Sequence, residues 1–304
     1  MKMFICTHSV MKMKLRYELF KLCKSKVLIA LFTLCVSLYC ILCVCAQPDL
    51  SEYTFDPKLY KMYAEKYSGK FTQQTLEEMN SELEQLTQQS QQPLENKAFT
   101  AEEYIKADNK RIAAQQKANA LGAVIERYQQ LKGGSRLVYD LEINAYHTGW
   151  LRKLGLLLCL ALITVITLKI TLDDHKCGME QILFTTAAGK CKMLCAKLFI
   201  AALLAFITAV LFGCAELLLL SRWDLGDTSA PLQSFRGFET GVLTASMQTA
   251  LYLSFVLKVL LFAAYSAALM LFSRLTRSDI AAVCITLVLA SIVYYLLAAA
   301  MLIC

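Results

Sequence analysis

This chain is poor in charge and lacks the motifs that hold nucleotides or activate hydrolytic groups. Charged residues make up 18% of its 304 residues, against about 25% in an ordinary soluble domain. There is no Gly-x-x-x-x-Gly-Lys-Ser/Thr loop, no His-Glu-x-x-His pair and no Gly-x-Ser-x-Gly turn. The three histidines, His8, His147 and His175, lie in separate segments. We therefore predict that the chain is not an enzyme and carries no cofactor.

Cysteine is absent from residues 47–150, although the whole chain has thirteen. This segment therefore contains no disulfide, and we expect helix packing to hold it together. His175, Cys177, Cys191 and Cys195 would supply four zinc ligands in number. Because cysteine is also frequent elsewhere in the chain, where it behaves as a small apolar residue, we predict no metal site.

Five long apolar runs dominate the sequence instead. A helix needs about 20 residues to cross the hydrocarbon core of a bilayer, and each run is about that long. A backbone in lipid must satisfy its own hydrogen bonds, so the runs are expected to be helices. The fold class predicted is all-α, a polytopic helical membrane protein. The predicted spans are residues 27–46, 151–172, 198–220, 250–272 and 280–303.

The distribution of positive charge predicts the orientation in the plasma membrane. Basic flanks stay in the cytoplasm, which places the N-terminus inside. Alternation then puts 47–150 and 221–249 outside, and 173–197 and 273–279 inside. The net charge of +7 consequently reflects topology and gives no reason to expect a nucleic-acid partner. Seven basic residues precede the first span: Lys2, Lys12, Lys14, Arg16, Lys21, Lys24 and Lys26.

The chain is thus expected to have four parts. Residues 1–26 include an amphipathic cytoplasmic helix over 11–26, with leucines on one face and lysines on the other. Residues 27–46 form the first span, which we interpret as an uncleaved anchor because secretory apolar regions are only about 7–15 residues long. Residues 47–150 form an extracytoplasmic helical domain. Residues 151–304 hold the remaining spans and the cytoplasmic loop 173–197.

Within 47–150 the patterns favour helical hairpins over any sheet. We predict a helix over 51–68 that ends at Gly69, and a second over 71–89, capped by Thr72 or Thr75. A third is predicted over 100–131, where Glu103 stands three residues after Thr100, as in a capping box.

The later spans carry two further signals. Small residues recur every fourth position at Ala201, Ala205, Ala209 and Gly213, a spacing that lets helices approach closely in lipid. Glu216 and Lys258 are ionisable residues within predicted spans. Such residues are costly in a membrane, so we consider both as candidates for a translocation path or an internal ion pair, with an ordinary wet or snorkelling side chain as the alternative.

Several segments together resemble the permease subunits of type-2 ATP-binding-cassette exporters of Gram-positive bacteria. They are LRYELFKL at 15–22, YAEKYSGKFTQQTLEEMNSEL at 63–83, EQILFTTAAGKCK at 180–192, and APLQSF at 230–235 leading to TASMQTALYLSFVLK at 244–258. The resemblance implies a separate ATPase subunit as partner, and a second permease copy or half. That class usually has six spans and this sequence predicts five, so either a span has been lost or the sequence is a truncated form.

On this resemblance the cytoplasmic loop couples the permease to its ATPase. A short helix over 179–186 and a turn near Gly189 would receive motion from the ATPase. Glu180 is expected to anchor the contact, and Thr185, Gly189, Lys190 and Lys192 complete the coupling residues. The alternative function is a non-transporting membrane sensor or binding subunit that uses its extracytoplasmic helical domain. A membrane-embedded enzyme is the weakest reading, because no catalytic constellation is visible.

Overall fold

The structure is a computed structural model that describes residues 20–22, 24–70, 72–91, 101–131, 135–176, 187–239, 245–275 and 279–303. In these residues its regular secondary structure is helical apart from one two-stranded sheet and an isolated bridge, in agreement with the all-α prediction. Two compact units are present. We call them the span unit (Met1–Ala46, Trp150–Arg222 and Tyr252–Met301) and the polar unit (Gln47–Gly149, Trp223–Leu251 and Leu302–Cys304). The helix predicted over 11–26 lies mostly outside the described residues.

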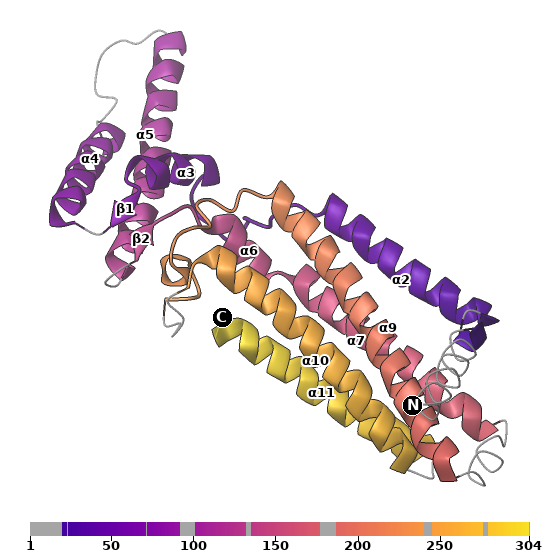
Figure 1. Ribbon diagram of the computed structural model, residues 1–304. Helices are drawn as coiled ribbons and strands as arrows, with labels where there is room; N and C mark the ends of the chain where they lie inside the picture. The colour runs from indigo at the N-terminus through magenta and orange to yellow at the C-terminus, as the bar shows by residue number, and fades with distance from the viewer. Residues whose placement is uncertain are drawn as a thin grey trace. The chain divides into compact units, whose positions relative to one another are not determined.

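Four of the five predicted spans are confirmed as helices long and apolar enough to cross a membrane. The candidate spans are Lys26–Cys45, Trp150–Thr171, Leu194–Arg222 and Met247–Ser273. They belong to helices α2 (Lys26–Cys45), α7 (Trp150–Lys176), α9 (Ala187–Arg222) and α10 (Met247–Leu275), whose long axes run in roughly the same direction in Figure 1. The chain is therefore a helical protein with four candidate membrane spans.

The fifth apolar run is helical, and its span remains a prediction. Helix α11 covers Asp279–Ile303. Among its described side chains the apolar stretch is Cys284–Leu297, which is shorter than the length of about 20 residues that a crossing needs.

The predicted small-residue face of α9 is confirmed by burial. Ala201, Ala205, Ala209 and Gly213 are all buried, and α9 contacts both α2 and α7. Alanine and glycine at this spacing let the helix backbones approach closely, which favours packing where burial from water gives no driving force.

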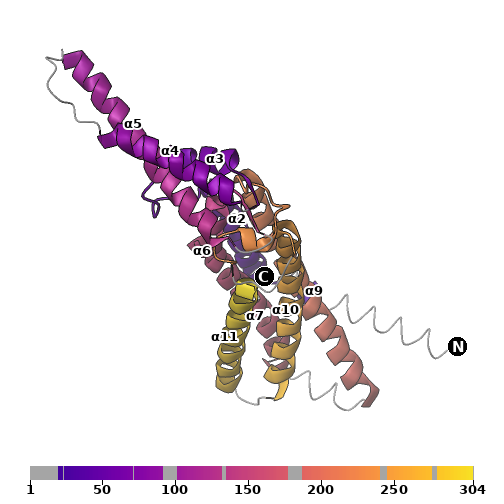
Figure 2. The same cartoon turned by 90° about the vertical axis from the view of Figure 1, so that its left-hand side faces the viewer.

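The polar unit contains the three predicted helices with shifted bounds. Helix α3 is Pro57–Lys66, much shorter than predicted at its start, because Pro57 occupies the first turn and Asp56 Oδ1 accepts a hydrogen bond from the Lys58 amide at 2.8 Å. Helix α4 is Gln73–Gln91, and Thr72 Oγ1 accepts from the Thr75 amide at 3.3 Å. Helix α5 is Ala101–Gln130, and it extends beyond the end of α4 in both views (Figures 1 and 2).

Other elements of the polar unit were not predicted. Strand β1 (Gly69–Lys70) pairs antiparallel with β2 (Arg136–Leu137), so the expectation of a purely helical segment was wrong at this point. Gly69 has a φ of 145°, which suits the turn out of α3 into β1. Helix α6 (Leu141–Thr148) follows β2, and the short 3-10 helix η1 (Leu232–Ser234) belongs to the second loop.

Residues 223–251 fold together with 47–149, which is a larger unit than the sequence predicted. The second loop closes on itself through the Leu232 amide and the Ala245 carbonyl (2.9 Å), and through the Met247 amide and the Ala230 carbonyl (3.0 Å). Its apolar residues pack with those of α6 and the segment before it in one cluster: Val138, Ile143, Ala230, Leu232, Phe235, Phe238, Met247 and Ala250.

Candidate functional site

The strongest candidate site is an ion pair inside the span unit. Lys258 Nζ of α10 lies 2.5 Å from Glu216 Oε2 of α9, and each side chain is only 12% exposed. The sequence singled out both residues, and the structure brings them together. Two opposite charges that contact each other in a low-dielectric region offset part of the cost of removing each from water.

A third side chain, Tyr39 of α2, completes this cluster. Its hydroxyl donates to Glu216 Oε1 at 3.4 Å, so the two carboxylate oxygens face different helices. The Tyr39 ring is 1% exposed and stacks on Phe212 of α9, with ring centroids 4.9 Å apart. Sequence reasoning missed Tyr39, because a tyrosine inside an apolar run carries no charge to mark it.

Two glycines make room for the cluster. A Cβ added at Gly155 of α7 would lie 2.2 Å from the Tyr39 hydroxyl oxygen and 2.4 Å from its ring. A Cβ added at Gly213 of α9 would lie 2.2 Å from the ring of Phe255 of α10. Both glycines therefore act as notches that receive an aromatic side chain from a neighbouring helix.

Replacing Gly155 with alanine is expected to destabilise the chain by about 1–3 kcal/mol, the usual cost of overpacking a filled core. The matched control is Gly122→Ala in α5, where an added Cβ meets no atom within 4 Å. Alanine in that open helix position should stabilise by about 0.5–1 kcal/mol. Thermal unfolding of the chain in lipid nanodiscs would measure both. Equal stability of the Gly155→Ala variant and the original chain would show that the notch is not tight.

Polar contacts also join α7 to α10 within the span unit. The hydroxyls of Thr164 and Tyr265 lie 2.6 Å apart, and those of Thr167 and Ser266 lie 3.0 Å apart. Hydroxyl pairs between helices in lipid contribute about 0.6 kcal/mol each on average. These two pairs fix the register of α7 against α10, the helix that carries Lys258.

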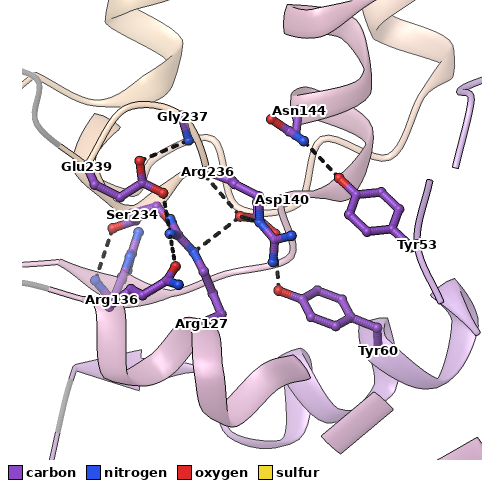
Figure 3. A network of polar contacts seen from close by, with 11 residues as sticks. Tyr53, Tyr60, Arg127, Arg136, Asp140, Asn144, Ser234, Arg236, Gly237 and Glu239 are labelled. Carbon is purple, nitrogen blue, oxygen red and sulfur yellow. Dashed lines mark hydrogen bonds and ion pairs between the residues drawn. The ribbon is translucent and has the colours of Figure 1, made fainter. Parts of the chain in front are cut away.

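A second buried charge cluster lies in the polar unit (Figure 3). The Arg127 side chain of α5 is 1% exposed and lies between two carboxylates: its Nε is 3.4 Å from Asp140 Oδ2, and its Nη1 is 2.5 Å from Glu239 Oε1. Its Nη2 donates to the Ser234 carbonyl at 3.0 Å. Arg127 thus joins α5 to the segment before α6 and to the second loop.

Asp140 is the centre of this cluster and is fully buried. It accepts from the Tyr60 hydroxyl at 3.2 Å and from the Arg236 amide at 3.0 Å. Desolvation raises the pKa of Asp140 even though Arg127 and Arg236 oppose the shift. Desolvation, with the nearby Asp140 charge, also raises the pKa of Tyr60 and keeps its hydroxyl a donor. The network therefore holds two loops together rather than presenting a reactive group.

The predicted coupling residues are placed only in part. Glu180 and Thr185 lie outside the described residues. Gly189, Lys190 and Lys192 lie in the first turns of α9, with side chains outside the described part. The predicted turn near Gly189 was wrong, because α9 already begins at Ala187. No group of three or more His, Cys, Asp or Glu residues able to hold a metal ion is found where the structure describes the chain.

No protein-family model, curated protein or solved structure matches the chain. The arguments about function therefore depend on the geometry above and on the sequence resemblance.

Proposed function

We propose that this chain is the membrane-spanning permease subunit of an ATP-binding-cassette transporter, an exporter driven by a separate ATPase subunit. The observation that carries the proposal is the Glu216–Lys258 ion pair, buried between two long apolar helices. Ionisable residues at such positions are expensive and are commonly part of a substrate or ion path. Glu216 and Lys258 then line or gate that path.

The proposed partner contact is the connection between α7 and α9 together with the first turns of α9. The sequence EQILFTTAAGKCK at 180–192 resembles the segment that contacts the ATPase in such permeases. A helix that continues directly from this contact into a span can transmit a rigid-body displacement. In this chain α9 begins at Ala187 and runs to Arg222, so a push at Lys190 or Lys192 would reach Glu216 along one continuous helix. A second permease copy, or a different half, would complete the transporter.

Co-purification tests the proposal. The tagged full chain, extracted from the membranes of its own cells, should carry a stoichiometric protein that hydrolyses ATP. Glu180→Ala should reduce the ATPase recovered about tenfold, the effect of losing about 1.4 kcal/mol from one charge-assisted contact. Glu77→Ala, an exposed change on α4, is the matched control and should leave recovery unchanged. Full recovery with both Glu180→Ala and disruption of 185–192 would contradict the proposed coupling role.

One observation favours the alternative, a non-transporting sensor or binding subunit. The polar unit has an open cleft of about 590 Å³ between the end of α3, the β1–β2 pair and residues 224–227. Ligand sites of small molecules occupy about 300–1,000 Å³. Its charged lining residues are Glu65, Arg136, Asp224 and Asp227, of which Arg136 and Asp227 pair at 2.6 Å. The sensor function predicts no stoichiometric ATPase with any form of the chain, so the same co-purification decides between the two.

A further inference from the structure

Helix α2 packs in the span unit at two places: Leu28 and Phe32 lie against the apolar cluster around Ile166 and Ile170, and Tyr39 and Cys43 are buried near its other end. Only 11% of its apolar window is buried, against 56% for α7. Its buried residues are Tyr39 and Cys43, which stand four positions apart and so share a face. Docking of this part of α2 therefore depends on the surroundings of Tyr39.

The Tyr39 side chain has two separable roles in its contacts. The ring fills the Gly155 notch of α7 and stacks on Phe212, which is packing. The hydroxyl reaches the Glu216 carboxylate, whose other oxygen binds Lys258. The Glu216 carboxylate thus takes part both in the contact with α2 and in the ion pair with Lys258.

We propose that Tyr39 is a positioning residue that couples the docking of α2 to the Glu216–Lys258 ion pair. The proposal extends the assignment of that pair to a translocation path and rests on it. While the pair is closed, Glu216 Oε1 stays oriented toward α2 and the Tyr39 hydroxyl holds the helix in place. When the pair opens or a substrate group replaces Lys258, the carboxylate turns and the C-terminal half of α2, which carries Tyr39 and Cys43, is released. Since coupling is reciprocal, moving α2 also loosens the pair.

Cys43 is a reporter already present in the chain. It is 1% exposed, lies one helical turn after Tyr39 and is close to the end of α2 at Cys45. In a chain that keeps Cys43 and has its other twelve cysteines replaced, the rate of maleimide labelling measures how often α2 undocks. A chain that keeps only the exposed Cys45 is the control for reagent access. Both are measured in lipid nanodiscs, without any ATPase.

Tyr39→Phe keeps the ring and removes the hydroxyl. We expect it to label about fivefold faster at Cys43, the effect of losing a net hydrogen bond of about 1 kcal/mol, and at an unchanged rate at Cys45. Tyr39→Phe also removes the contact between the Tyr39 hydroxyl and the Cys43 thiol, and this loss is the same in a Glu216→Leu/Lys258→Met background. In that background the change should therefore accelerate labelling clearly less than in the original chain, because the Glu216 partner is already absent. A purely structural tyrosine would give the same ratio in both backgrounds.

Two results would overturn the proposal: an unchanged rate for Tyr39→Phe in the original background, or an equal acceleration with and without the ion pair. Neither depends on a partner subunit. A chain that fails to recover an ATPase but shows the coupled labelling would refute the transporter function and leave the coupling of α2 intact. A chain that recovers an ATPase but shows no coupled labelling would refute only the role of Tyr39.

Discussion

Replacing Asp140 with alanine is expected to lower the free energy of unfolding of the polar unit by about 3–5 kcal/mol, the cost of breaking a buried ion network on one side. Asp140 is the carboxylate that Arg127 and Arg236 both face, and Arg127 is almost completely buried. Removal of the Asp140 carboxylate would leave the buried guanidinium group of Arg127 with fewer charge partners. Hydrogen exchange of the α5 backbone between Ala120 and Tyr128, measured in the full chain, should speed up by about two to four orders of magnitude.

Two further variants sharpen this result. The Tyr60 hydroxyl donates to Asp140 Oδ1 and the Arg236 amide to Oδ2. Asp140→Asn keeps an acceptor for one of these two donors, so its loss of stability should be smaller than that of alanine. Arg111→Ala removes an ion pair with Asp108 on the exposed face of α5, and exposed pairs contribute only about 0–1 kcal/mol. If Asp140→Ala exchanged no faster than Arg111→Ala, the network would not be what holds the two loops together.

Four candidate spans and two of the helices were predictable from the sequence because their signals are local. An apolar run of about 20 residues identifies a span without reference to the rest of the fold. The helical periods of α4 and α5 are likewise contained within each helix, and their observed bounds lie within two residues of the prediction. The start of α3 was misplaced because the turn around Pro57 and Asp56 outweighs the apolar pattern that precedes it.

The charge clusters show what the sequence could and could not indicate. Glu216 and Lys258 stand out because a charge inside an apolar run is rare, but nothing in the sequence shows that they touch. Arg127 and Glu239 are more than a hundred positions apart and read as ordinary solvated charges, so their burial depends on long-range packing. Gly155 has no signal of its own, since its role exists only where Tyr39 crosses α7.

Replacing Lys258 with methionine should also be strongly destabilising, by about 3–5 kcal/mol. Methionine retains most of the volume but removes the cation that contacts Glu216 at 2.5 Å. The double variant Glu216→Leu/Lys258→Met removes both charges and should recover most of that stability, because apolar residues of similar volume replace a buried pair at little or no cost. Thermal unfolding of the three proteins in nanodiscs measures the effect. A Lys258→Met protein as stable as the original would show that the pair is wet and not buried.

The stable double variant separates a structural pair from a functional one. If Glu216 and Lys258 only hold α9 against α10, the variant should keep full activity with the proposed ATPase subunit, measured as ATP hydrolysis by the two proteins in reconstituted membranes. If they belong to a translocation path, activity should fall at least about tenfold, equal to about 1.4 kcal/mol of lost interaction, while stability and ATPase recovery stay unchanged. The charge exchange Glu216→Lys/Lys258→Glu restores an ion pair with the opposite polarity. If this charge-exchange variant is active, the path needs an ion pair in either orientation. If it is inactive, the path needs the negative charge at 216 and the positive charge at 258.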